Sequence, residues 1–215
     1  MKEKTIERIL ENRIITIVRG LEKEYMDPLA DALYRGGIRL IEVTFDQSDP
    51  DTWADTCSAI REISDKYVGR MTVGAGTVLT VRQIDMAADA GAEYMISPDA
   101  NPSVIEYTKK IGCVSIPGCM TPTEMTSAVN AGADIIKVFP AGILGVDYIK
   151  AVRAPLGHIP MFAVGGINTD NAAAFIKAGC AGIGLGGSLV SKELIKAGKF
   201  DRITELAEKF VRAVG

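Results

Sequence analysis

Apolar residues in this chain gather in short runs, and a segment with helical spacing follows almost every run. Each run is about three to seven residues long, which is typical of strands and too short for buried helices. Runs that are apolar throughout predict strands covered on both faces, as in a parallel sheet. The predicted strands are residues 14–18, 40–45, 71–73, 94–97, 114–116, 134–140, 161–164 and 182–185.

Helices are predicted between these strands, and two of them have clear starts. Thr80 is placed to cap one helix, and Thr121–Glu124 is a capping box with proline at the first helical position. Glycine often follows the helical pattern, as at Gly36 and Gly91, where it tolerates a left-handed backbone. The predicted helices cover residues 3–12, 24–34, 53–63, 80–90, 102–110, 121–131, 148–152, a segment ending at 178, and 201–214.

Strands that alternate with helices predict an α/β fold with a parallel sheet. The spacing of the strands is even, and no Gly-x-Gly-x-x-Gly motif opens the first helix. Both features favour a closed (β/α)8 TIM barrel over an open doubly wound sheet. The helix before the first strand is expected to be an N-terminal capping helix. With 215 residues and no linker-like tract, residues 1–215 are predicted to form a single domain.

Composition narrows the possible partners. The formal net charge is −3, from 24 Lys and Arg against 27 Asp and Glu, so no basic surplus predicts nucleic-acid binding. No apolar run is long enough for a membrane span, and we expect a cytoplasmic protein. The four cysteines are dispersed, which predicts free thiols. The single histidine, His158, lies in a predicted loop and excludes a multi-histidine metal site, so no metal is expected.

Lys137 is the most unusual residue of the predicted core. It lies within a run of β-branched and aromatic residues, where a charged ammonium is costly. By strand alternation Ile135, Lys137 and Phe139 point to one side. One interpretation is an amine kept neutral by burial, which can attack a carbonyl and form a Schiff base. The other is a structural lysine that reaches water or pairs with Asp134.

Glu42 and Arg19 are candidates for the same site. On the second predicted strand Ile41, Val43 and Phe45 share a wholly apolar face, which should contact the helices and turn Glu42 into the barrel. An inward carboxylate beside an inward amine can transfer protons. The alternative is a structural ion pair of Glu42 with Lys137 or Arg19. Arg19 directly follows the first strand and is either a surface residue or an anion clamp at the barrel mouth.

Glycine pairs follow the last two predicted strands. They are Gly165-Gly166 and Gly186-Gly187, and Ser188 follows the second pair. A single pair usually means a turn. Loops after strands seven and eight of a barrel commonly bind phosphate, because glycines let backbone N–H groups approach an anion. The two pairs together therefore predict a phosphate site at the carboxyl ends of the strands.

A family pattern runs through nearly the whole chain. It consists of Ile17-Val18-Arg19-Gly20, Ile41-Glu42-Val43-Thr44, Gly74-Ala75-Gly76-Thr77-Val78, Ile96-Ser97-Pro98, Ile116-Pro117-Gly118, Ile136-Lys137-Val138-Phe139-Pro140, Val164-Gly165-Gly166-Ile167 and Leu185-Gly186-Gly187-Ser188. In this order and spacing the chain resembles the 2-keto-3-deoxy-6-phosphogluconate (KDPG) and 4-hydroxy-2-oxoglutarate (KHG) aldolases, which are class I pyruvate aldolases.

The resemblance implies specific roles. Lys137 would be the Schiff-base lysine and Glu42 the general acid/base. The substrate pocket would contain Arg19, Thr77, Pro98 and Phe139. The phosphate would be held by Gly165, Gly166, Gly186, Gly187 and Ser188. The resemblance also implies a homotrimer that needs no cofactor and no metal, because the lysine itself forms the covalent intermediate.

The implied reaction is the cleavage of KDPG to pyruvate and glyceraldehyde 3-phosphate, with cleavage of 4-hydroxy-2-oxoglutarate to pyruvate and glyoxylate as a second activity. Two departures concern the substrate. Asp46 stands where some members have an arginine that grips the carboxylate, and Val164 precedes the paired glycines where many phosphogluconate-type members have threonine. The segments 162–166 and 178–182 look closer to the 6-phosphogalactonate aldolases, so that epimer is the alternative substrate.

Two alternatives lie outside this family. A phosphate-binding barrel isomerase or synthase would share the late glycine loops but use acid/base residues without a covalent lysine. A barrel that only binds sugar phosphates would use the same loops without cleavage.

Overall fold

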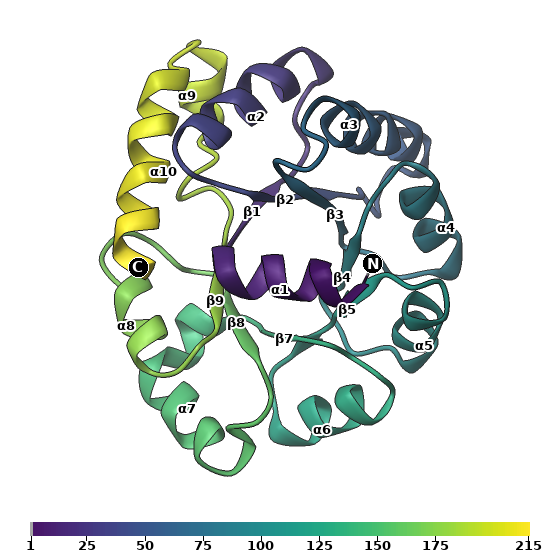
Figure 1. Ribbon diagram of the computed structural model, residues 1–215, viewed down its shortest axis with the longest axis vertical. Coiled ribbons are helices and arrows are strands. Elements are labelled where there is room, and N and C mark those ends of the chain that lie inside the picture. The colour runs from purple at the N-terminus through teal and green to yellow at the C-terminus, as the bar shows by residue number, and fades with distance from the viewer. Residues whose placement is uncertain (1) are drawn as a thin grey trace.

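The computed structural model describes residues 2–215, and within them nine parallel strands form one sheet. Their order is β5-β4-β3-β2-β1-β9-β8-β7-β6. The strands are β1 (Ile14–Val18), β2 (Leu40–Thr44), β3 (Thr72–Gly76), β4 (Tyr94–Ile96), β5 (Val114–Ile116), β6 (Gly118–Cys119), β7 (Ile136–Val138), β8 (Met161–Val164) and β9 (Gly182–Leu185). Figure 1 shows them arranged as a ring inside a circle of helices.

The ring closes through Pro117, which alone separates β5 from β6. β5 pairs with β4 on one side, while β6 pairs with β7 on the other. Proline has no N–H for the ladder, but its carbonyl still accepts a hydrogen bond from the Lys137 N–H at 2.9 Å. If β5 and β6 are taken as one interrupted strand, the nine strands form an eight-stranded barrel. The predicted (β/α)8 barrel is therefore confirmed.

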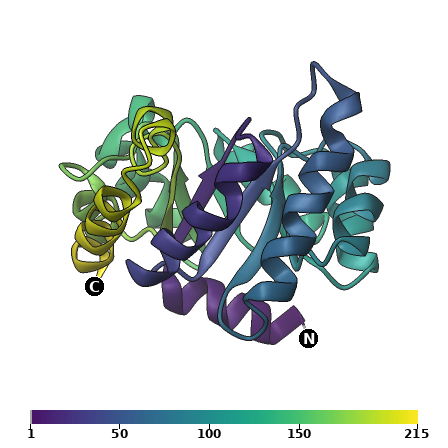
Figure 2. The ribbon, with the colours of Figure 1, turned by 90° about the horizontal axis from the view of Figure 1, so that it is seen from above.

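The described helices surround the barrel and also cover one of its ends. They are α1 (Lys2–Asn12), α2 (Met26–Arg35), α3 (Trp53–Lys66), α4 (Val81–Asp89), α5 (Pro102–Lys110), α6 (Pro122–Asn130), α7 (Ala141–Leu156), α8 (Ala172–Lys177), α9 (Lys192–Lys196) and α10 (Phe200–Val214). Figures 1 and 2 show α1 lying across the end of the barrel where the strands begin. Within residues 2–215, no helix combines the length and apolar character needed to cross a membrane.

Two helix starts follow the predicted capping chemistry. The Thr80 hydroxyl accepts from the Gln83 N–H, and the Thr121 hydroxyl accepts from the Glu124 N–H. In both cases the side chain at the third helical position accepts a hydrogen bond from the backbone N–H of the cap residue. These capping boxes fix the direction in which the chain leaves the carboxyl ends of β3 and β6.

Three elements differ from the prediction. α7 begins at Ala141 rather than near residue 148, and it changes direction at Gly145, where φ is 82°. Two glycines in its first turns hide the helical pattern, since glycine has low helix propensity. The five-residue α9 and the two-residue β6 are too short to show a period.

Small and large side chains alternate inside the barrel. One buried cluster fills the interior and contains Ile9 of α1 together with Ile15, Leu40, Tyr94, Ile96, Val114, Ile116, Ile135, Phe162 and Val164. A Cβ at Gly74 would lie 2.1 Å from the Tyr94 ring, so this glycine makes room for the tyrosine. Tyr94 in turn donates to the Ile41 carbonyl at 2.7 Å. The predicted capping role of the first helix is confirmed, because Ile9 closes this cluster.

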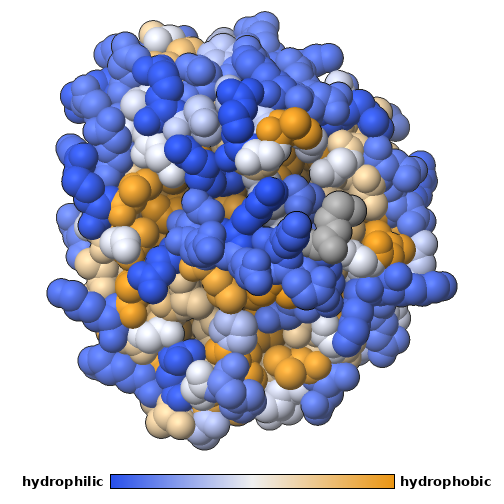
Figure 3. Space-filling view, viewed as in Figure 1, coloured by the Kyte–Doolittle hydropathy of each residue, from blue (hydrophilic) through white to orange (hydrophobic). Residues whose placement is uncertain are grey.

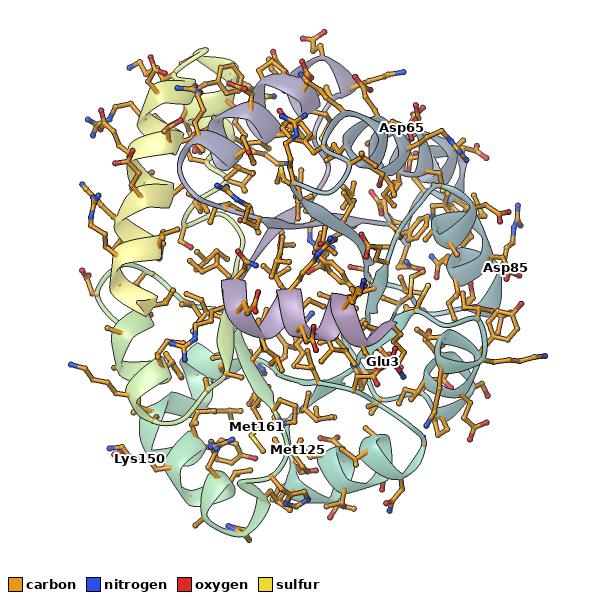
Figure 4. The ribbon with its side chains drawn as sticks, in the orientation of Figure 1. Glu3, Asp65, Asp85, Met125, Lys150 and Met161 are labelled. Carbon is orange, nitrogen blue, oxygen red and sulfur yellow. The ribbon has the colours of Figure 1, made fainter. Side chains whose placement is uncertain are left out.

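The second, larger cluster lies between the strands and the outer helices. In Figure 4 Met125 of α6 and Met161 of β8 belong to this layer, and both are fully buried. Asp65, Asp85 and Lys150 extend outward from the helices in the same view and are exposed. At its sides, the interior of the barrel is thus separated from water by this outer apolar layer and the helices.

Candidate active site

Lys137 is the central residue of β7 and points into the barrel. Its neighbours Ile136 and Val138 belong to the outer cluster, while Ile135 belongs to the interior cluster. The predicted alternation is therefore confirmed. Lys137 is only 7% exposed, and burial lowers the pKa of its ammonium below the ordinary value. Its Nζ lies 5.0 Å from the centroid of the Phe139 ring.

Asp134 does not neutralise this lysine. Its carboxylate forms an ion pair with Lys2 at 2.7 Å and accepts a hydrogen bond from the Ser115 N–H at 2.9 Å. The interpretation of Lys137 as a lysine paired with Asp134 is therefore wrong. Asp134 instead ties the start of β7 to α1 and β5, so it belongs to the structural end of the barrel.

Glu42, in the middle of β2, is the second buried charge of the interior. It is 1% exposed, and burial raises the pKa of its carboxyl group, although the charges of Lys137 and Arg19 act in the opposite direction. Its Oε2 has no hydrogen-bond partner among the described residues. No direct ion pair joins Glu42 to Lys137 or Arg19 in residues 2–215, so the alternative of a structural ion pair fails.

The two groups influence each other through space. The negative charge of Glu42 raises the pKa of Lys137, and the positive charge of Arg19 lowers it. Burial, the largest effect on both, favours the neutral amine and the neutral acid. An amine with a lowered pKa can attack a carbonyl more readily, and a carboxyl group with a raised pKa can both take up and donate a proton.

Gly76 makes the space for the Glu42 carboxylate. A Cβ at this position would lie 1.8 Å from Glu42 Oε1 and 2.5 Å from its carboxyl carbon. The sequence motif includes Gly76, but the sequence does not predict that this glycine makes room for Glu42. A sequence signal for this function is the alternation of glycines along β3. Gly74 and Gly76 both face the interior, opposite the large side chains of Tyr94 and Glu42.

Arg19 and Thr77 meet at the barrel mouth. Arg19 Nη2 donates to Thr77 Oγ1 at 3.1 Å, and the Thr77 carbonyl accepts from Gln47 Nε2 at 2.7 Å. Thr77 has a φ of 55°, a left-handed conformation that is unfavourable for a β-branched residue. Such strain is often retained where a side chain must be held in place. Arg19 therefore lies at the barrel mouth beside Thr77, and the contact of Gln47 with Thr77 is not predicted by the sequence.

Pro98 and Phe139 follow β4 and β7, at the same end of the barrel. Pro98 lies against β6, because a Cβ at Gly118 would come within 2.3 Å of the Pro98 carbonyl oxygen. Phe139 lies against the next loop, because a Cβ at Gly165 would be 3.1 Å from its ring. Both residues therefore follow strands at the end of the barrel where the loops gather, and the Phe139 ring also lies near Lys137.

The Gly165-Gly166 loop is held from both sides. Gly165 and Gly166 have φ values of 88° and 76°, which only glycine adopts readily. The Gly165 carbonyl accepts from the Gly142 N–H at 2.7 Å, and the Gly166 carbonyl accepts from Asn171 Nδ2 at 2.9 Å. Asn171 was not predicted, and it fixes the orientation of the loop.

Backbone donors are left free in these loops. Within residues 2–215 no protein acceptor binds the N–H groups of Gly166, Gly187 and Ser188. A Cβ at Gly186 or Gly187 would meet nothing within 4 Å, so these glycines face open space. Free N–H groups beside open space are suited to an anion.

A cavity of about 640 Å³ opens beside the mouth, between the loops that follow β1 and β2. Its lining includes Arg19, Thr44, Thr77 and Asp46, but neither Lys137 nor Glu42. Hydrogen bonds from the Ser48 hydroxyl and N–H hold the Asp46 carboxylate and lower its pKa. No group of three or more His, Cys, Asp or Glu residues in the described chain is arranged to hold a metal ion.

Comparisons with known proteins place this site in a family. Residues 5–206 match the family described as KDPG and KHG aldolase. A probable 2-dehydro-3-deoxy-6-phosphogalactonate aldolase of Rhizobium meliloti (strain 1021) is 38% identical over 181 residues, or 84% of this chain and 82% of the relative. A 2-dehydro-3-deoxy-phosphogluconate aldolase of Treponema pallidum (strain Nichols) is 36% identical over 214 residues, 98% of both chains.

A solved structure also matches. It is a KDPG aldolase of Legionella pneumophila, with pyruvate captured at low pH as a covalent carbinolamine intermediate. It is 28% identical, with a TM-score of 0.83 over 94% of this chain and 96% of that one. The fold and the two buried residues define a (β/α)8 barrel with a lysine and a carboxylate in its interior. The chain belongs to the KDPG and KHG aldolase family, and the resemblance in the motifs is confirmed.

Replacing Gly76 tests how Glu42 is positioned. Gly76→Ala places a methyl group where Glu42 Oε1 now lies, so the carboxylate must move by more than a bond length. We expect aldolase activity to fall by about 10²-fold or more, because such displacements of a catalytic group are costly. Steady-state kinetics with the substrates of the family measure the loss.

A double variant provides the control. In the Glu42→Asp background the shorter side chain leaves room for the new methyl group, so Gly76→Ala should cost much less there. Equal costs in both backgrounds would show that Gly76 acts by another route.

Proposed function

We propose that this protein is a class I aldolase that cleaves KDPG to pyruvate and glyceraldehyde 3-phosphate through a Schiff base on Lys137. A second activity on 4-hydroxy-2-oxoglutarate would give pyruvate and glyoxylate. The observation that carries the proposal is a buried lysine that has no direct ionic partner within residues 2–215 and shares the barrel interior with a buried carboxylate. Neither group gains enough from its surroundings to be kept for stability alone.

The reaction begins at the amine. Neutral Lys137 attacks the C2 ketone to give a carbinolamine. Its hydroxyl group takes a proton from the Glu42 carboxyl group and leaves as water, which gives an iminium and the Glu42 carboxylate. Glu42 removes the proton of the C4 hydroxyl, with a bound water between them. The C3–C4 bond breaks, its electrons move to the iminium nitrogen, and the aldehyde leaves. The remaining enamine is protonated at C3, and hydrolysis releases pyruvate and restores the lysine. In this scheme no external cofactor takes part.

The remaining residues hold the substrate. We assign the carboxylate to Arg19 and Thr77, the methylene and keto group to Pro98 and Phe139, and the phosphate to the loops of Gly165-Gly166 and Gly186–Ser188. The free N–H groups of those loops support the last assignment. Asp46 stands where some family members have an arginine for the substrate carboxylate. We therefore assign the binding of that carboxylate to the guanidinium of Arg19.

The epimer of the sugar acid is the finer question. Relatives named for the phosphogalactonate and the phosphogluconate substrates are 38% and 36% identical, a difference too small to separate them. Val164, before the glycine pair, supports the galactonate epimer as the alternative substrate. A barrel isomerase or a binding protein would have no use for the free amine of Lys137.

The assembly is proposed to be a homotrimer in the cytoplasm. Apolar side chains exposed at the mouth support an interface between copies. Met120 follows β6, Phe139 follows the adjacent β7, and Ile143 is 85% exposed in the first turn of α7. A second copy could cover these side chains.

Covalent trapping tests the nucleophile directly. Pyruvate with borohydride should reduce a Schiff base onto the peptide that contains Lys137, as read by peptide mass spectrometry. Lys137→Ala should abolish trapping and lower kcat by at least about 10³-fold. Lys150→Ala, at an exposed lysine paired with Asp147, is the control and should leave both unchanged. A label on another lysine would overturn the mechanism.

The pH dependence of trapping tests the electrostatics. Only the neutral amine attacks, so the rate rises with pH through the pKa of Lys137. Glu42→Gln removes a charge that raises this pKa, so the rise should move to lower pH. Arg19→Gln removes a charge that lowers it, so the rise should move to higher pH. Inactivation by pyruvate and cyanoborohydride measures both profiles, and shifts in the same direction would contradict the arrangement.

The phosphate assignment predicts a substrate-dependent effect. Ser188→Asp brings a negative charge to the proposed phosphate loop, and kcat/KM for KDPG should fall by about 10- to 100-fold or more. Cleavage of 4-hydroxy-2-oxoglutarate, which has no phosphate, should be nearly unchanged and serves as the internal control. An equal loss with both substrates would place the phosphate elsewhere.

A further inference from the structure

A separate cavity of about 370 Å³ opens at the other end of the barrel. Its lining consists of Arg8, Asn12, Tyr34, Arg39, Gly69, Arg70 and Thr72, and we refer to it as the arginine cavity. Arg8 belongs to α1, Arg39 directly precedes β2, and Arg70 lies two residues before β3. The cavity therefore lies where the strands begin, while Lys137 and the glycine loops face the end where they finish.

The charge of this cavity is uncompensated. Among the described residues its lining has no Asp or Glu, and none of its three arginines forms an ion pair. Figure 3 shows strongly hydrophilic side chains along α1 and beside it on this face. Three unpaired guanidinium groups around one hollow, in a protein with a net charge of −3, produce a local positive field that attracts anions.

The guanidinium groups are held in place by the protein. The Arg39 guanidinium lies 4.3 Å from the Tyr34 ring centroid, and that of Arg70 lies 5.5 Å from the same ring and 5.0 Å from that of Tyr67. Arg39 Nη1 donates to the Tyr34 and Ile38 carbonyls, both at 2.8 Å. Stacking and these bonds reduce the entropy that a ligand would otherwise have to overcome.

Donors remain for a ligand. Of the Arg39 guanidinium, only Nη1 donates to the protein. Of the Arg70 guanidinium, only Nη2 does so, to the Lys66 carbonyl. The Arg8 guanidinium has no protein acceptor within residues 2–215. Each arginine thus has unused N–H groups, and the three arise from three different segments.

We propose that the arginine cavity binds the phosphate group of a small metabolite. Guanidinium groups that approach from several segments suit a tetrahedral, doubly charged oxyanion, whereas a planar carboxylate is satisfied by one fork. A volume of about 370 Å³ is within the range of small-ligand sites and exceeds the size of a phosphate alone. The ligand does not compete with the substrate, because the two sites lie at opposite ends of the barrel.

Inorganic phosphate is the probe, and the Ser188→Asp protein is the starting point, since its proposed catalytic phosphate loop is blocked. Phosphate added at constant ionic strength should raise the Tm of this protein, because a ligand stabilises the state that binds it. Acetate, a planar monoanion, should not. No effect of phosphate, or an equal effect of acetate, would overturn the proposal.

Arginine variants locate the effect. Adding Arg39→Gln and Arg70→Gln should weaken the apparent phosphate affinity by about tenfold or more. The matched control adds Arg61→Gln and Arg82→Gln, which remove the same charge. Arg61 also donates to a backbone carbonyl, and Arg82 also lies over an aromatic ring. If both pairs of substitutions weakened the apparent phosphate affinity equally, the effect would come from net charge alone. That result would overturn the proposal.

Chemical protection needs no substitution. In the unmodified protein, phosphate should slow the reaction of phenylglyoxal with Arg8, Arg39 and Arg70 and leave Arg61 and Arg82 unaffected, as read by peptide mass spectrometry. Lack of protection at all three cavity arginines would refute the site, even if the variants failed to fold. Trapping of pyruvate on Lys137 is scored separately, so failure of the aldolase proposal would not be mistaken for failure of this one.

Discussion

Burial of Lys137 and Glu42 in one barrel, without a direct bond between them, is the constraint on which the rest of the site depends. Each charge is costly in an apolar interior, and burial shifts both pKa values toward the neutral forms. The surrounding strands supply the apolar walls that cause these shifts. At the far end, Ile9 of α1 packs on the interior cluster and adds to this apolar surrounding. The lowered pKa of the amine thus depends on the whole barrel.

Glycines determine where these groups can lie. Gly76 leaves the volume that the Glu42 carboxylate occupies, and Gly142 and Gly165 allow the Gly165-Gly166 loop to approach the end of β7. Phe139 contacts that loop at Gly165 and also lies near Lys137 Nζ. The loop assigned to the phosphate and the lysine assigned to the chemistry therefore share one aromatic ring, which holds the two ends of a substrate site at a set separation.

The two ends of the barrel have different charges. At the carboxyl ends of the strands, the positive charges of Lys137 and Arg19 act on Glu42, and that of Arg19 also acts on Asp46. At the amino ends, Asp134 is neutralised by Lys2, while the arginine cavity has no acidic partner in the described chain. Chemistry at a barrel mouth needs tuned and opposed charges, whereas a surplus of one sign is suited to attracting an ion.

The sequence by itself determined eight of the nine strands, most helices, the barrel class, and the inward direction of Lys137 and Glu42. These follow from local periods and from strand alternation, which need only near neighbours. It could not determine that Asp134 pairs with Lys2, that Gly76 accommodates Glu42, or that Arg8, Arg39 and Arg70 surround one cavity. Those relations join residues far apart in the chain, and only the closure of the barrel brings them together.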